Sequence, residues 1–147
     1  MVSAKSGPGP AWTAVSFPEQ GYLWFALKNP RLLASTVLWL SNGGRHYAPW
    51  SSRHRRVLGI EDVTAYFHFG LADSIAANPV SRRGIPTALK LRADRPLTIP
   101  YIMGVVAIPA RFGTVRTVAF AKNHATFIDT AGRRVSTAVD TAFLNTP

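Results

Sequence analysis

The sequence predicts an all-β protein, a β-sandwich with one short helix. Runs rich in β-branched and aromatic residues recur at a spacing of roughly ten residues and are separated by turn signals, which is typical of sandwiches and barrels. The 147 residues are 47% hydrophobic and 16% charged, a composition that suits a packed core and not a disordered chain. Only residues 71–77 have a helix-like composition, and Asn78-Pro79 would end that helix.

Each element is bounded by turn residues. The Gly-Pro-Gly-Pro run predicts a flexible lead-in over residues 1–11, and residues 12–147 then form a single domain. Pro18, the Asn29-Pro30 pair and the segment 41–44 end the first three expected strands, and residues 130–132 predict a hairpin turn. The expected strands are 12–17, 22–27, 35–40, 57–60, 87–91, 97–106, 114–121, 125–128 and 135–139.

Composition excludes several classes of protein. There is no cysteine, so disulfide frameworks, thiol nucleophiles and Cys-based metal sites are excluded. The longest apolar run, around residues 101–110, contains Pro109 and is shorter than the ~18 residues that span a bilayer. The first ten residues have no apolar stretch of a signal peptide. We therefore expect a cytoplasmic protein with no membrane partner.

The charge balance raises the question of nucleic acid. Lys and Arg number 17 against 7 Asp and Glu, a net charge of +10, and basic domains often bind phosphate backbones. The basic residues are spread along the chain, however, with one cluster at residues 53–56, and the balance reflects few acids. A basic nucleic-acid-binding module is therefore kept as the weaker alternative.

Motif searches predict neither metal nor cofactor. Asn42-Gly43-Gly44 lacks the Lys and Ser/Thr of a phosphate-binding loop. The histidines at 46, 54, 68 and 124 do not fall at the spacing of metal ligands on one element.

The segment 38–50 has a composition suited to sugars. Aromatic rings stack on the apolar face of a pyranose, while amide and guanidinium groups bond its hydroxyls. The candidate contacts are Asn42, Arg45, His46 and Trp50. The alternative interpretation is that Trp39 and Trp50 are ordinary core or edge aromatics.

Glu61 is the candidate catalytic residue. It follows the apolar run Val-Leu-Gly-Ile, where partial desolvation would raise the pKa of its carboxyl toward that of a general base. In an extended segment Asp62 would point to the opposite face. The alternative is that Glu61 pairs with one of the many arginines.

The segments 38–50 and 58–63, followed by Asn78-Pro79 and Gly84-Ile85-Pro86, resemble the C-terminal part of galactose mutarotase-like proteins, the aldose 1-epimerase superfamily. The similarity runs from about Trp12 to Leu144. It implies a β-supersandwich, a sugar-binding face and cofactor-free interconversion of aldose anomers. The general base of that family matches Glu61, and sugars or sugar phosphates are the implied partners.

Two hypotheses follow. In the first, the chain is an aldose 1-epimerase-like isomerase with Glu61 as base, and His46 or His68 must supply the acid. In the second, it is a non-catalytic carbohydrate-binding protein or a truncated remnant of the family. The chain has no His-Pro pair, the segment that carries the acid in the family, and this favours the second. Because sandwich folds often need about 200–250 residues, the chain resembles a C-terminal half, whose open sheet edges favour self-association.

Overall fold

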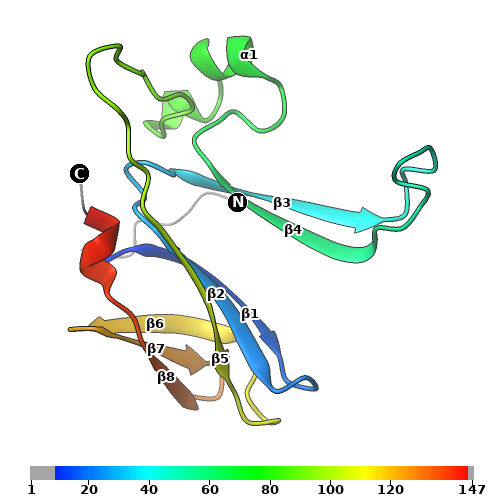
Figure 1. The fold of residues 1–147 in the computed structure, drawn as a ribbon, viewed down its shortest axis with the longest axis vertical. Coiled ribbons are helices and arrows are strands. Elements are labelled where there is room, and N and C mark those ends of the chain that lie inside the picture. The colour runs from blue at the N-terminus through cyan, green and yellow to red at the C-terminus, as the bar shows by residue number, and fades with distance from the viewer. Residues whose placement is uncertain (1–8, 146–147) are drawn as a thin grey trace. The chain divides into compact units, whose positions relative to one another are not determined.

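A computed structural model describes residues 9–145, and it is mainly β (Figure 1). Eight strands form three antiparallel sheets in this part of the chain, with one short α-helix and two 3-10 turns. The described residues fall into two compact units, residues 31–91 and residues 9–30 together with 92–145. The all-β fold class is therefore confirmed, whereas the expected lead-in lies largely outside the described residues.

The unit made of residues 9–30 and 92–145 consists of two three-stranded sheets. The first has the order β1-β2-β5 and the second the order β6-β7-β8. Their bounds are β1 Ala11–Phe17, β2 Tyr22–Lys28, β5 Tyr101–Ala107, β6 Val115–Ala121, β7 His124–Asp129 and β8 Arg134–Ala138. A 3-10 turn, Thr141–Asn145, follows β8.

One apolar core joins these two sheets. Leu23 and Leu27 of β2 are fully buried, as is Phe127 of β7, and the rings of Phe25 and Phe127 lie 4.9 Å apart. Gly104 on β5 faces Phe25, since an added Cβ would come within 2.8 Å of the Phe25 ring. The alternation of apolar and polar residues along these strands thus places one face of each sheet in the core.

Asp129 fixes the turn after β7. Its carboxylate accepts hydrogen bonds from the backbone N–H of Gly113, Ala131 and Arg133, and it pairs with Arg133 Nε at 2.7 Å. Burial raises the pKa of this carboxyl, but the hydrogen bonds outweigh it and hold the pKa at about 2. The expected hairpin turn at residues 130–132 is present.

The other unit, residues 31–91, is built on a long two-stranded hairpin. β3, Ser35–Asn42, pairs with β4, Arg55–Val63, and residues 43–54 form the connecting loop (Figure 1). β4 is longer than the expected 57–60 and contains Glu61 and Asp62. Opposed residues of an antiparallel pair share a face, so the register of Val37 with Glu61 and of Thr36 with Asp62 puts the two carboxylates on opposite faces.

The rest of this unit consists of loops and short turns, part of which is organised by hydrogen bonds of Asn78. The short helix α1, Leu71–Ile75, ends before Asn78, and the 3-10 turn Ser81–Arg83 follows it. The side-chain amide of Asn78 donates to Asp73 O, Ala76 O and Thr87 Oγ1, while its Oδ1 accepts from Val80 N and Ser81 N. The helix expected over 71–77 is present, two residues shorter.

Two strand predictions need correction. The expected strand 87–91 is wrong. The hydroxyl of Thr87 instead accepts a hydrogen bond from the Asn78 side-chain amide and donates one of 2.7 Å to Ser74 O. Such local side-chain bonds compete with sheet pairing. The strand expected over 97–106 begins at Tyr101, since Pro100 has no N–H to give to a ladder.

Candidate functional site

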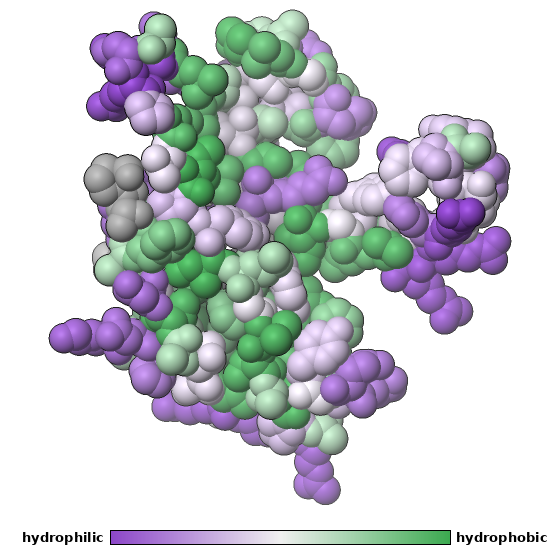
Figure 2. Space-filling view, in the orientation of Figure 1, coloured by the Kyte–Doolittle hydropathy of each residue, from purple (hydrophilic) through white to green (hydrophobic). Residues whose placement is uncertain are grey.

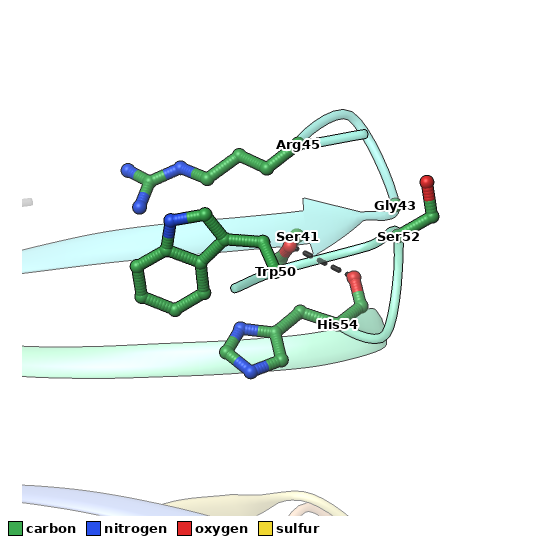
Figure 3. Close-up of a pocket in the computed structure, with 6 residues that line it drawn as sticks. All are labelled: Ser41, Gly43, Arg45, Trp50, Ser52 and His54. Carbon is green, nitrogen blue, oxygen red and sulfur yellow. Dashed lines mark hydrogen bonds between the residues drawn. The ribbon is translucent and has the colours of Figure 1, made fainter. Parts of the chain in front are cut away.

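The loop half of the β3–β4 hairpin carries a cluster of two tryptophans, one arginine and one histidine, which we call the Trp cluster. It consists of Trp39 of β3 and of Arg45, Trp50 and His54 of the connecting loop. The guanidinium carbon of Arg45 lies 5.3 Å from the Trp39 ring centre and 4.9 Å from that of Trp50, which are cation–π distances. Figure 3 shows the indole of Trp50 between the side chains of Arg45 and His54. Arg45 and Trp50, two of the predicted sugar contacts, therefore do come together.

Gly59 explains how Trp39 fits on the hairpin. It lies directly opposite Trp39 in the register, and a Cβ at position 59 would come within 3.2 Å of the indole. The indole of Trp39 thus lies against the strand partner because that partner has no side chain.

Glu61 lies on the same face as Trp39. The two residues are diagonal neighbours across the ladder, a relation in which side-chain carbons are roughly 7–8 Å apart. Trp39 therefore has the carboxylate of Glu61 on the side away from the loop and the guanidinium of Arg45 on the side toward the loop.

The environment of Glu61 is not the one expected. Glu61 is exposed, so the expected partial desolvation is wrong. In the described chain β4 pairs only with β3. Asp62 is half-buried on the opposite face, and there its Oδ1 accepts a hydrogen bond of 2.6 Å from Thr36 Oγ1.

The two other predicted contacts lie elsewhere in the hairpin. His46 is turned to the loop end, where its Nδ1 lies 2.7 Å from Ser52 Oγ. Asn42 lines a separate, open hollow of about 390 Å³, together with aliphatic side chains of Leu40, Val57 and Leu58 and with Arg56. That hollow contains no aromatic ring on which a sugar could stack.

The space inside the Trp cluster is small. It measures about 10 Å³ and is lined by Ser41, Gly43, Arg45, Trp50, Ser52 and His54 (Figure 3), which is the room that one water needs. A pyranose would therefore have to lie on the open face of the cluster and not inside it.

His54 is the residue that sequence reasoning missed. Its ring makes edge contacts with Trp39 and Trp50, at 5.9 and 5.1 Å between ring centres. In the described part of the chain its Nδ1 is the one buried side-chain nitrogen or oxygen without a hydrogen-bond partner. In the sequence, His54 stands in an Arg-His-Arg-Arg run, which indicates a charged segment and not a binding residue. No spacing rule connects position 54 with Trp39, since only the hairpin register brings them together.

The backbone of His54 lies further along the hairpin than Glu61, toward the loop. Glu61 lies opposite Val37, whereas His54 is bonded through its carbonyl to Ser41 Oγ, four residues further along β3. Four extended residues span roughly 13 Å. Of the two expected acids, His46 is bonded to Ser52 at the loop end, and His68 packs against Phe67 and Phe69 in the turn that follows β4.

The described residues contain no group of three or more His, Cys, Asp or Glu side chains that could hold a metal ion. In the same range, no helix is long and apolar enough to cross a membrane. No family model, curated protein or solved structure matches the chain. The likeness to mutarotase-like proteins, and the supersandwich that it implies, therefore remain predictions.

Proposed function

We propose that this protein binds a carbohydrate on the open face of the β3–β4 hairpin, with Trp39 as the stacking surface. The single observation that carries the proposal is the shared face of Trp39, Arg45 and Glu61. An aromatic ring flanked by one acceptor and one donor is the combination that recognises both the apolar face and the hydroxyls of a sugar.

Arg45 supports the proposal because its position is fixed while its hydrogen-bonding groups are free. Its guanidinium lies over the two indoles, and none of its N–H groups donates a hydrogen bond within residues 9–145. A planar guanidinium held by stacking presents its donors in one plane at little further entropic cost.

The test is calorimetric titration with D-glucose and D-galactose at millimolar concentration. Trp50→Ala removes the ring that holds Arg45 and should weaken binding about two- to tenfold. Trp24→Ala, a tryptophan of the other unit, is the matched control and should bind as the wild type does. Equal affinities in all three proteins, or no heat with either sugar, would refute the proposal.

A second candidate is aldose 1-epimerase-like catalysis. It is favoured by the placement of Glu61 beside the stacking surface, where a carboxylate could take the proton of an anomeric hydroxyl. Neither expected acid lies beside Glu61, because His46 is bonded to Ser52 at the loop end and His68 lies in the turn that follows β4. The binding function is therefore the one that the hairpin supports best.

Polarimetry separates this candidate from binding alone. Glu61→Gln should lower the rate of mutarotation about 10²–10⁴-fold if Glu61 is the general base. Glu19→Gln is the matched control, since Glu19 and Glu61 are the only glutamates in the sequence. A Glu61→Gln protein as fast as the wild type would exclude the catalytic role and leave the binding proposal standing.

A further inference from the structure

The loop end of the β3–β4 hairpin concentrates positive charge in a stretch of sequence that has no acidic residue. Four arginines, at 45, 53, 55 and 56, fall within a stretch from residue 20 to residue 60 that contains no Asp or Glu. None of the four forms an ion pair within the part of the chain that the structure describes. Figure 2 shows the resulting strongly hydrophilic surface at the end of the hairpin.

Ser52 holds two cationic or ionisable side chains at this end. Its hydroxyl lies 2.7 Å from His46 Nδ1, and its carbonyl accepts a hydrogen bond of 3.3 Å from Arg55 Nε. Its N–H donates to Arg45 O at 2.8 Å, which closes the loop. The Nη groups of Arg55 and Nε2 of His46 are left without a hydrogen bond among residues 9–145.

Gly43 makes room for Arg55. It has a φ of +80°, and a Cβ at this position would lie 3.3 Å from Arg55 Cγ and 3.4 Å from its Nε. The Arg55 side chain therefore lies directly over the backbone of residue 43 because that residue has no side chain. Gly43 and Ser52 together thus position a guanidinium whose Nη groups make no hydrogen bond within residues 9–145.

We propose that this loop end is a subsite for a phosphate ester, formed by Arg55 and His46 and surrounded by the positive charge of Arg53 and Arg56. The proposal rests on the proposed function, in that the ester would be carried by a sugar lying on Trp39. A guanidinium fork matches two oxygens of a phosphate, and a dianion gains from every nearby positive charge. Neither Arg55 nor its neighbours Arg53 and Arg56 is paired with a carboxylate of residues 9–145.

The first arm of the test uses inorganic phosphate alone, measured by ³¹P line broadening and calorimetry. Arg55→Ala should weaken phosphate binding about tenfold or more, the usual loss for a hydrogen bond to a charged group. Arg82→Ala is the matched control, since Arg82 is exposed in the same unit without an ion pair. If Arg55→Ala binds phosphate as the wild type does, or if Arg82→Ala loses as much, the subsite is refuted.

The second arm compares D-glucose with D-glucose 6-phosphate. The wild type should bind the phosphate ester more tightly than glucose, and Arg55→Ala should remove that advantage while it still binds glucose, which also shows that the hairpin is folded. If glucose binds but its 6-phosphate binds no better, the subsite fails and the proposed function stands. If neither sugar binds while inorganic phosphate still depends on Arg55, the proposed function fails and the subsite stands.

Discussion

Gly59 and Glu61 both lie beside Trp39 on one face of the hairpin. Gly59 gives the indole of Trp39 its place on the hairpin, and the strand alternation then puts Glu61 on the same face. The spacing of a Gly-x-Glu motif thus has a physical reason here. The sequence alone predicted Glu61 as a candidate, but not the role of Gly59, because strand register is invisible without the pairing partner.

A glycine-to-alanine pair tests this relation. Gly59→Ala should displace the indole, since a Cβ would lie 3.2 Å from Trp39 Cε3, and should alter the near-ultraviolet circular dichroism and lower sugar affinity about two- to tenfold. Gly44→Ala is the control, because no atom lies within 4 Å of a Cβ at position 44. Indistinguishable spectra and affinities for the two variants would show that Trp39 does not depend on Gly59.

Asp129 gives a pH-dependent prediction. Its pKa in the folded protein, about 2, is below the usual 3.8, so its stabilising contribution is complete above about pH 4 and is lost as the pH falls from 3.8 toward 2. The melting temperature of Asp129→Asn should therefore lie below that of the wild type at pH 7, and the difference should shrink toward pH 2. Asp140→Asn, an exposed aspartate of the same unit, should show little difference at either pH. A constant difference for Asp129→Asn at all pH values would contradict this assignment.

At the scale of the element, the hairpin and the two-sheet unit differ in how they are held. β2 is the central strand of a sheet and has fully buried leucines, whereas β3 and β4 pair only with each other in the described chain, and Leu40 is 79% exposed. Two-stranded sheets are marginally stable in water. The backbone amides of β3 should therefore exchange with deuterium faster than those of β2, and equal protection in the two strands would contradict this.

The contact between β2 and β5 gives a stability prediction. Gly104→Ala would place a Cβ 2.8 Å from the ring of the buried Phe25, and overpacking of this kind costs about 1–3 kcal/mol of unfolding free energy. Urea denaturation followed by far-ultraviolet circular dichroism measures the cost. A variant as stable as the wild type would mean that Phe25 moves aside freely.

The strand boundaries show which parts of the fold the sequence patterns predict correctly. The strands of the two-sheet unit were predicted to within a few residues because their boundaries are prolines, glycines and asparagines with local effects. The strand at 87–91 was predicted wrongly because local composition does not indicate a hydrogen bond to a residue nine positions away. In the structure the Asn78 side-chain amide donates to Thr87 Oγ1. The upstream limit of β4 was missed because Arg55 and Arg56 lack strand-like composition, and their pairing depends on β3.

For the whole molecule, composition was sufficient to predict an all-β fold, but not the division into sheets. Seventeen basic residues against seven acidic ones gave the net charge, whereas only the structure shows that four of the arginines lie at the end of the hairpin without an ion pair in the described part of the chain. In the same way the predicted contacts Arg45 and Trp50 do meet, while His46 lies at the loop end beside Ser52 and Asn42 lines a separate hollow.

The four tryptophans provide the most direct test of sugar binding by the hairpin. Trp39 and Trp50 belong to the hairpin unit, and Trp12 and Trp24 belong to the other unit, so each indole N–H is a separate reporter in a ¹H–¹⁵N NMR spectrum. Titration with D-glucose should shift the indole signals of Trp39 and Trp50 and leave those of Trp12 and Trp24 in place. Shifts confined to Trp12 and Trp24, or no shift at any of the four, would contradict the proposed site.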